Sequence, residues 1–430
     1  MLASLMAAFR IPDLKKRITF LFAMFAVYVI GLHISVPGVN TEILAEKLGG
    51  GQDNLFSLFD AFTGGAFKRY TIFAMGIMPY INASIIMQLL TIAIPQLEAL
   101  QKEGASGQKK IRLYTRWLTG VLALFQAYGT TMLLRGYGAI QGSSSIFDVS
   151  VLKIAIVLVA GTSFLMYLGE QISDRGIGNG VSIVIFAGIV AVLPAQIWQT
   201  VQVEGIENHR WFVIAVMAVL FVATVAFIVA ITQAQRKIPI QHVKRIVGNK
   251  MVGGSSSFLP LKINSAGVIP IIFAVSIMYF PMTIVNLFTT DKDSIAYSIA
   301  SGIMPGNTWW GSLSYGLLIL FFTYFYTAVT FNVKEVSDNL KKWGSFIPGI
   351  RPGKPTQDYL DKIMTRITLS GAVFLAIIAL MQYLVPNWLR VTSFSLIGGT
   401  SLLIVVGVAL ETMQAIESHL LMRHYEGFIK

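Results

Sequence analysis

Ionisable side chains, the groups that most often do chemistry, are almost missing from the long apolar stretches of this sequence. His33, Glu170 and Glu411 come closest, and each lies near the end of an apolar stretch rather than at its centre. Ion- and proton-coupled carriers commonly use carboxylates or histidines inside the membrane, so these positions indicate interfacial roles. Carrier sites can also be built from broken helices and backbone carbonyls, and an inverted-repeat secondary transporter therefore remains an alternative.

Enzyme motifs are missing as well. The 430 residues include no cysteine, which excludes a disulfide, a thiolate metal site and a cysteine nucleophile. The sequence contains no Walker motif, no paired metal-ligand histidines and no GxSxG. The segment GIGNG at 176–180 lacks the GxGxxG spacing of a dinucleotide site. We therefore predict no catalytic residue, no metal and no cofactor, which disfavours an intramembrane enzyme.

The composition indicates that lipid is the solvent for much of this chain. Hydrophobic residues make up 55% of it and charged residues only 13%, with a mean hydropathy of +0.68. A soluble chain usually carries about 25% charged residues. The first residues, MLASLMAAFRIPDLKKR, hold no short apolar stretch with a cleavage site, so we expect no removable signal peptide.

Ten runs without Asp, Glu, Lys or Arg predict membrane-spanning helices, because a spanning helix needs roughly 20 apolar residues. In the eighth run the Gly- and Trp-rich segment 302–311 is interpreted as a loop, which leaves about 312–331 to span. The period-2 alternation of a membrane barrel is missing, so we predict an all-α membrane protein. The runs cover residues 18–41, 70–97, 117–134, 154–169, 176–203, 211–235, 263–290, 294–333, 367–389 and 391–410.

Lysine and arginine fall mainly on one side of this topology. Of the 33 basic residues, 25 lie in the two terminal segments or in loops on the same side as them. Basic loops remain in the cytoplasm, and an even number of helices therefore places both termini there.

Two of the predicted cytoplasmic loops are long. Residues 236–262 carry six basic residues and no acid, and residues 332–366 form the second loop. The loops either merely satisfy the positive-inside rule or form a docking surface for an anionic partner. Ribosomal RNA and an acidic protein surface would both fit the second reading.

The segment NLFSLFDAFTGGAF at 54–67 lies on the other side and is apolar yet too short to span. It follows three glycines at 49–51 and precedes Lys68 and Arg69. It is either an amphipathic helix lying on the membrane or a re-entrant half-helix between glycine hinges. The second alternative places it inside the protein, where irregular backbone at membrane depth is tolerated.

Helix breakers interrupt several runs, at Pro79, Gly267, Pro270 and the glycine pair 398–399. They either aid close helix packing or mark kinks and half-helices around a cavity. Aliphatic side chains near the breakers would form a narrow apolar constriction that blocks ions by dewetting, although lipid-facing aliphatics are equally ordinary. These side chains are Ile77, Ile81, Val181, Ile185, Ile272 and Ile404.

Six sequence blocks, in order over nearly the whole chain, resemble the SecY/Sec α-subunit family, the channel-forming subunits of the bacterial Sec protein translocase. A match of several long blocks is far more specific than a single short motif. The blocks are FAMGIMPYINASIIMQLL at 73–90, KEGASGQKKI at 102–111, GEQISDRGIGNGVSI at 169–183, LPLKINSAGVIP at 259–270, FNVKEVSDNLKKWGSFIPGIRPGKPT at 331–356 and GGTSLLIVV at 398–406.

The resemblance implies ten helices in two inverted-topology halves of five, residues 1–203 and 204–430, around an hourglass pore. It implies a non-enzymatic channel that translocates secretory polypeptides and releases membrane proteins laterally into lipid. The six aliphatic side chains named above match the family's pore ring, with Val181 where isoleucine is common. The family's re-entrant plug helix matches about 54–67, including Leu55, Phe56, Leu58, Phe59, Phe62, Gly64 and Gly65.

The resemblance also implies a lateral gate between helices at about 77–94 and 266–288, with Asn82, Ile85, Gln88, Ser276 and Phe280. The implied partners are SecE, SecG, the SecA motor, the ribosome through its rRNA, signal peptides, nascent polypeptides and membrane lipids, in the bacterial cytoplasmic (inner) membrane. A partner must supply the energy, since this chain has no nucleotide motif. Docking of SecA and the ribosome is expected at Arg236, Lys237, Lys244, Arg245, Lys250, Arg351 and Lys354.

Overall fold

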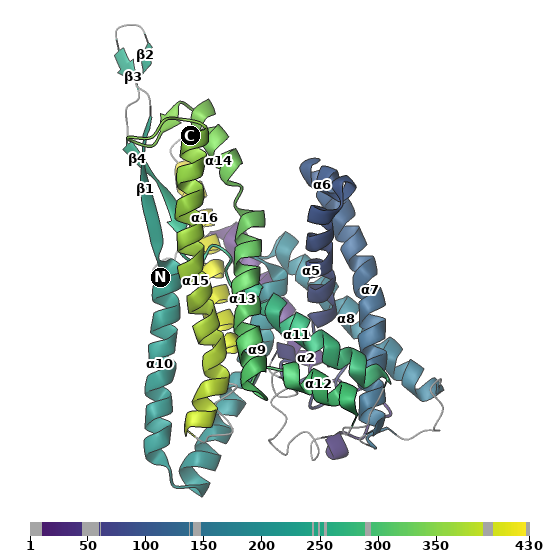
Figure 1. Ribbon diagram of the computed structural model, residues 1–430. Coiled ribbons are helices and arrows are strands. Elements are labelled where there is room, and N and C mark those ends of the chain that lie inside the picture. The colour runs from purple at the N-terminus through teal and green to yellow at the C-terminus, as the bar shows by residue number, and fades with distance from the viewer. Residues whose placement is uncertain are drawn as a thin grey trace.

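The computed structural model is mainly helical (Figure 1). It describes residues 11–44, 60, 62–136, 138–140, 148–242, 245–247, 250–252, 256–288, 294–389 and 399–426. In chain order the helices are α2 (Pro12–Gly31), α5 (Met78–Ala93), α6 (Pro95–Lys102), α7 (Ala105–Gly136), α8 (Val149–Arg175), α9 (Gly180–Thr200), the π-helix η1 (Val201–Glu207), α10 (Trp211–Gln233), α11 (Ile269–Phe288), α12 (Ile295–Ile303), α13 (Trp309–Thr330), α14 (Val333–Lys342), α15 (Lys354–Leu389) and α16 (Thr400–Glu426).

Every charge-free run of the sequence contains a helix, namely α2, α5, α7 to α11, α13, α15 and α16. Among the described residues, seven helices are long and apolar enough to cross a membrane, and there are eight if α5 and α6, which are bent by 100°, count as one span. Two helices that lie in charge-free runs are not in this count. The first turns of α2 are charged, and α11 is apolar only over Ile269–Met282. The ten-helix fold is consistent with these elements.

The eighth run differs in detail from the prediction. It holds two helices, because α12 reaches Ile303 and α13 already begins at Trp309. The hydroxyl of Thr308 accepts a hydrogen bond from the Gly311 amide at 2.9 Å and so caps the first turn of α13. The loop expected over 302–311 is therefore reduced to residues 304–308.

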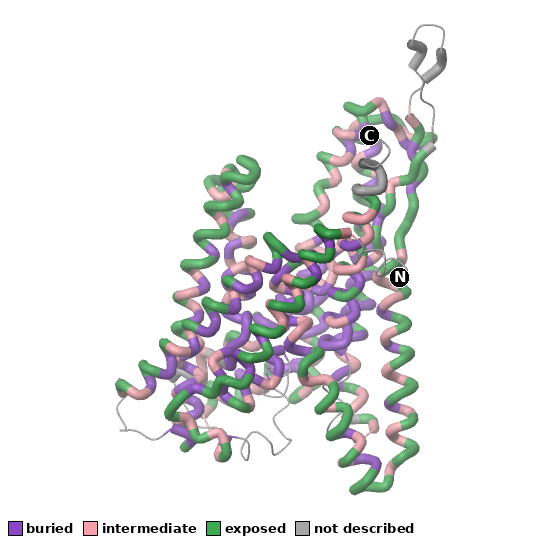
Figure 2. Tube along the Cα trace, turned by 180° about the vertical axis from the view of Figure 1, so that it is seen from behind, coloured by how far each residue is buried: buried purple, intermediate pink, exposed green. Residues whose placement is uncertain are grey.

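The helices form two arms that are bridged by α11 (Figure 1). One arm contains α5, α6 and α7, and the other contains α10, α13 and α15. Helix α11 contacts α5 and α7 on one side and α13 on the other. Buried residues concentrate where the arms meet, whereas the outer helices expose apolar side chains (Figure 2). Exposed apolar side chains on long helices are the surface expected of a chain in lipid.

Strands occur beyond the apolar helices, where only loops were predicted. Strand β1 (Gln235–His242) pairs antiparallel with β4 (Ser256–Lys262), and its other edge pairs with β5 (Ser345–Phe346). Strands β2 (Arg245–Val247) and β3 (Lys250–Val252) form a separate hairpin near the tip (Figure 1). The all-α prediction misses this small sheet.

The sheet joins the two long loops into one body, which we call the extramembrane unit: β1, β4, β5, α14 and the first turns of α15. Its core is apolar and comprises Ile238, Ile240, Leu261, Leu340, Ile347 and Leu360. The His242 ring lies between the hydroxyls of Ser257, at 3.1 Å from Nε2, and Ser345, at 2.8 Å from Nδ1. One imidazole thus connects all three strands.

The predicted boundary between the two halves, at residues 203 and 204, falls inside η1. The buried Glu204 carboxylate accepts a hydrogen bond from the Arg210 guanidinium at 3.1 Å, which also donates to the Leu389 carbonyl at 2.9 Å. The linker between α9 and α10 is thus fixed to the end of α15.

Candidate functional site

The six aliphatic side chains singled out in the sequence belong to, or pack against, one large hydrophobic cluster in the interior of the fold. Four helices supply them, and we call the group the pore ring. Ile77 directly precedes α5 and Ile81 lies in it, Val181 and Ile185 lie in α9, Ile272 lies in α11, and Ile404 lies in α16. Five are buried in one hydrophobic cluster and Val181 packs against that cluster half-buried. Ile404 is 0% exposed. The arrangement can close a passage but offers no polar group to bind a solute.

All four helices of the pore ring begin close to it. Ile77 directly precedes α5, and the other five ring residues lie within the first six residues of their helices. Pro79 and Pro270 occupy first turns, where a missing amide donor costs nothing. Gly267 and Gly399 have φ of +64° and +77° just before α11 and α16. The breakers therefore start helices at the constriction rather than kinking them.

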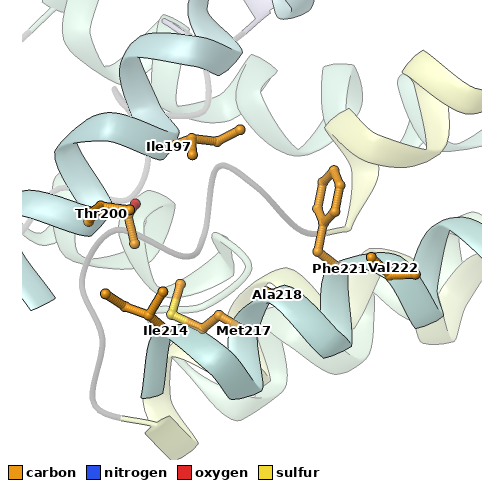
Figure 3. Close-up of a pocket in the computed structure, with 8 residues that line it drawn as sticks. Ile197, Thr200, Ile214, Met217, Ala218, Phe221 and Val222 are labelled. Atoms are coloured by element: carbon orange, nitrogen blue, oxygen red, sulfur yellow. The ribbon is translucent and has the colours of Figure 1, made fainter. Parts of the chain in front are cut away.

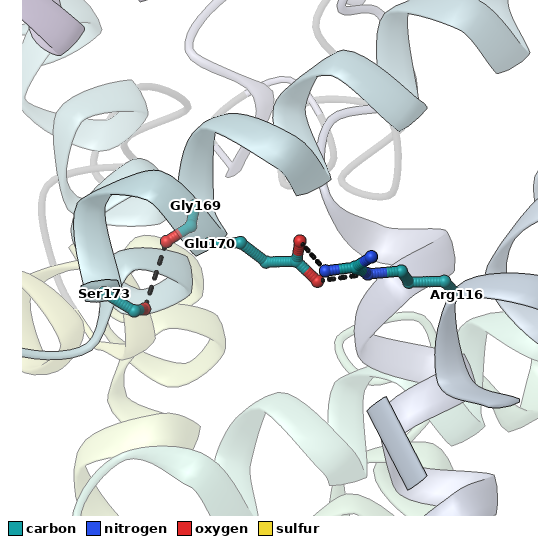
Figure 4. A network of polar contacts seen from close by, with 4 residues as sticks. All are labelled: Arg116, Gly169, Glu170 and Ser173. Carbon is teal, nitrogen blue, oxygen red and sulfur yellow. Dashed lines mark hydrogen bonds and ion pairs between the residues drawn. The ribbon is translucent and has the colours of Figure 1, made fainter. Parts of the chain in front are cut away.

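The start of α9 is fixed by α8. The Gly180 amide donates to the Ser173 hydroxyl at 2.9 Å. That hydroxyl donates in turn to the Gly169 carbonyl at 3.0 Å, the bond that Figure 4 shows. A Cβ at Gly180 would lie 1.8 Å from the Gly169 oxygen, so only glycine permits this approach. The Asn179 side chain then accepts from the Val181 amide at 3.1 Å and caps α9.

Only the end of the predicted plug lies within the described residues. Leu55, Phe56, Leu58 and Phe59 fall outside them, whereas Phe62, Gly64 and Gly65 are described. Phe62 is buried in the same cluster as the pore ring.

Gly64 and Gly65 have φ of +72° and +79° and form the turn that follows Phe62. A Cβ at Gly64 would lie 2.9 Å from the Cα of Gly188 on α9, so the two backbones touch. The Tyr28 hydroxyl of α2 donates to the Thr63 carbonyl at 3.4 Å. This part of the segment therefore lies inside the protein, which favours the re-entrant alternative over a helix on the membrane surface.

Asp60 is buried at the base of this turn, outside the spanning helices. Its Oδ1 accepts from the Lys68 amide at 2.8 Å, and its carbonyl accepts from the Gly65 amide and the Thr63 hydroxyl at 2.9 and 3.2 Å. Burial raises the pKa of Asp60, although the Lys68 amide and the charges of Lys68 and Arg69 act in the opposite direction. The Asp60 carboxyl therefore links the start of this turn to Lys68 at its end.

Three of the five predicted gate residues line a small pocket between α5, α7 and α11. The pocket measures about 40 Å³, enough for bound water, and Asn82, Ser276 and Phe280 lie on its wall. The Ser276 hydroxyl is buried and has no hydrogen-bond partner among the described residues. Ile85 lies instead in the pore-ring cluster, and Gln88 is half-buried on α5 away from the pocket wall.

Besides Met75, Met78 and Tyr279, sequence reasoning missed two polar residues of this wall, Gln126 and Thr130 of α7. Their spacing of four places both on one helix face. Two polar side chains at that spacing in an otherwise apolar run are the pattern that would have identified them.

A larger hollow of about 210 Å³ lies between α9, η1 and α10 (Figure 3). Its lining is apolar apart from the Thr200 hydroxyl, and includes Ile197, Ile214, Met217 and Phe221. Without a charged or nucleophilic group it cannot support acid–base or covalent chemistry.

Two of the three ionisable residues singled out in the sequence, Glu170 and His33, have hydrogen-bond partners. Arg116 of α7 and Glu170 of α8 form a two-pronged ion pair with distances of 2.8 and 2.6 Å (Figure 4). The His33 ring lies just beyond α2, with its Nδ1 2.9 Å from the Val29 carbonyl of that helix. No group of three metal-ligating side chains occurs in the part of the chain that the structure describes.

The predicted docking residues gather on the extramembrane unit and its tip. Arg236 and Lys237 are exposed on β1, and Arg351 and Lys354 are exposed where α15 begins. The backbone of Arg245 and Lys250 is described in the hairpin of β2 and β3, and Lys244 is outside the described residues.

Comparisons with known proteins agree with this geometry. The SecY family model matches residues 71–413. The protein translocase subunit SecY of Streptomyces galbus is 43% identical over 441 residues, covering 100% of both chains. A solved protein-conducting channel is similar with a TM-score of 0.62 and 18% identity, covering 94% of this chain and 92% of that one. The idle yeast Ssh1 complex, bound to the yeast 80S ribosome, is similar with a TM-score of 0.63 and 14% identity, covering 96% of this chain and 89% of that one.

Proposed function

The chain belongs to the SecY family of protein translocase subunits, and from that premise we propose how its residues form a gated, protein-conducting channel. Secretory polypeptides cross the membrane through its centre, and membrane segments leave sideways into lipid. The observation that carries this proposal is the pore ring, in which four helices bring five aliphatic side chains into one buried cluster and a sixth, Val181, against it.

The pore ring seals the resting channel. Short aliphatic side chains exclude water and ions when they touch, yet they hold no particular cargo, because none of them hydrogen-bonds. A conduit for polypeptides of any sequence must avoid tight binding, since a bound chain would not move on. The uncharged interior of the helices serves that requirement.

The segment 54–67 acts as the plug, on the side of the ring away from the cytoplasm. The burial of Phe62 beside the ring and the backbone contact of Gly64 with Gly188 support this role. The plug leaves when a polypeptide enters, and the two glycines at the turn supply the backbone freedom for that movement.

The seam between α5 and α11 acts as the lateral gate. An apolar signal sequence gains free energy by moving from water into lipid between separating helices. The polar side chains of Asn82, Ser276, Gln126 and Thr130 line one pocket beside this seam, where bound water would bridge them until the seam opens. Weak contacts of this kind hold the gate shut without making its opening prohibitive.

The extramembrane unit faces the cytoplasm, with both chain termini on that side of the bacterial cytoplasmic membrane. Its exposed basic residues, including Arg236, Lys237, Arg351 and Lys354, support docking of the SecA motor or of ribosomal RNA. SecE and SecG complete the channel. Energy for movement comes from the motor or from translation, since this chain carries no nucleotide motif.

Crosslinking to a stalled secretory polypeptide tests this proposal. A photoreactive residue at Ile81 or Ile272 should capture the stalled chain, whereas the same residue at the exposed Phe212 of α10 should capture lipid. A secondary transporter would instead bind a small solute saturably and give no polypeptide adduct at any of the three positions. Adducts of equal yield at Phe212 would contradict the central path.

A further inference from the structure

Gln382 of α15 makes an unusual contact across the fold. Its side chain is 1% exposed, and its Oε1 accepts two hydrogen bonds from Thr400, from the amide at 3.2 Å and from the hydroxyl at 2.6 Å. Because the amide is only a donor, the oxygen of the Gln382 side chain must face it. Thr400 is the first residue of α16, whose first amides have no partner within the helix. Gln382 therefore caps α16 from a neighbouring helix.

The backbone around this cap is tightly packed. Gly399, directly before α16, has a φ of +77°, and a Cβ there would lie 2.5 Å from the Cβ of Gln382. The Gly399 carbonyl accepts from the Leu403 amide at 3.0 Å and closes the first turn of α16. Ile404 follows Thr400 by four residues and so lies on the same helix face. The position of Thr400 thus determines where Ile404 enters the pore ring.

The other groups around Gln382 leave part of its amide unsatisfied. Its Nε2 interacts at most with the adjacent Tyr383 hydroxyl, and the buried Tyr315 and Ser401 hydroxyls have no hydrogen-bond partner among the described residues. The rings of Tyr315 and Tyr383 pack edge to face, with centroids 6.1 Å apart. A buried donor without a partner costs free energy, which a methionine at 382 would avoid. The two hydrogen bonds from Thr400 explain why residue 382 is a glutamine rather than an apolar residue.

We propose that Gln382 is a positioning residue of the channel seal, which holds Ile404 in the pore ring by capping the first turn of α16. This inference rests on the pore ring proposed above. Without the acceptor, the Thr400 amide loses its partner and the first turn of α16 frays. The ring then loosens although none of its own side chains has changed.

Ion flux through resting, full-length channels in vesicles, purified with their companion subunits, tests this inference. Gln382→Met keeps the length and bulk of the side chain but removes the acceptor, and should raise the flux on the order of tenfold. Thr162→Val on α8 is the matched control, since it removes a buried hydroxyl that bonds to no described residue and lies on a helix that supplies no pore-ring side chain, and it should leave the flux unchanged. Hydrogen exchange should increase at the first turn of α16 in Gln382→Met alone.

Thr400 provides a second, independent pair of variants. Thr400→Ser retains both donors and should stay tight, whereas Thr400→Val loses the hydroxyl donor and should leak. This pair decides the matter if Gln382→Met fails to fold. Ile404→Ala serves as the reference for the ring itself. If Ile404→Ala leaks while Gln382→Met and Thr400→Val stay tight, the positioning role is refuted and the ring stands. If Ile404→Ala also stays tight, both assignments are refuted.

Discussion

Shortening Ile404 to alanine should make the resting channel leak ions. Ile404 is fully buried in the pore ring, and opening the ring transfers that side chain toward water. Burial of an isoleucine side chain is worth about 1.5–3 kcal/mol. Since roughly 1.4 kcal/mol corresponds to a factor of ten, Ile404→Ala should raise the ratio of open to closed channels roughly 10- to 100-fold.

The assay is ion flux from vesicles that hold the channel without a secretory polypeptide. Ile416→Ala is the matched control, because Ile416 lies on the same helix and is buried, but in a separate cluster with Leu14, Ile18 and Ile177. Both substitutions should lower the free energy of unfolding by about 2–5 kcal/mol, and only Ile404→Ala should leak. Equal flux in the two variants would show that lost stability, rather than a broken seal, causes the leak.

Three further predictions concern the ring, the docking surface and the plug. Val181→Ile adds one methylene to a half-buried ring position, worth about 0.8 kcal/mol, and should lower residual flux roughly fourfold; a rise would mean that the ring has no room for it. Arg351→Glu should impair protein export while the channel still inserts normally, since the side chain is exposed; unchanged export would reduce Arg351 to a topology determinant. Burial raises the pKa of Asp60 above its unfolded value, so the folded turn binds the proton more tightly and its stability should fall as pH rises from about 4 through the folded pKa. Hydrogen exchange at 62–70 should show this loss of protection in the native chain and not in Asp60→Asn, and a pH-independent native chain would contradict the assignment.

The spanning helices were largely predictable because lipid imposes a strong rule on composition. Ten charge-free runs each contain a helix, and the main error, over 302–311, came from treating glycine and tryptophan as loop residues. The sheet was not predictable in the same way. In β1 the alternation of apolar and polar side chains that marks a strand is limited to Ile238 and Ile240, and the flanking residues are basic or polar. Its partner β5 lies about a hundred residues away, with His242 opposite Ser345, and no local pattern indicates such a pairing.

The site was predictable in part. Residue types alone did not separate the pore-ring aliphatics from ordinary lipid-facing ones, and the resemblance to the family selected them. The structure adds the reason that they meet, which is that four helices begin beside them. Long-range polar contacts were not predictable, because the partners of Glu170 and Gln382, namely Arg116 and Thr400, lie on other helices.

The pairing of β1 with β5 has a mechanical consequence. The loop that holds β1 and β4 connects α10 to α11, and the loop that holds β5 connects α13 to α15, so one rigid body is tied to the ends of four helices. Strand β4 ends at Lys262 and α11 begins at Ile269, a tether that spans at most roughly 20–25 Å when fully extended. We expect a load applied to this body by the proposed motor or by a ribosome to reach α11. Through α11 it would reach both the proposed lateral gate and Ile272, without any change in the loops themselves.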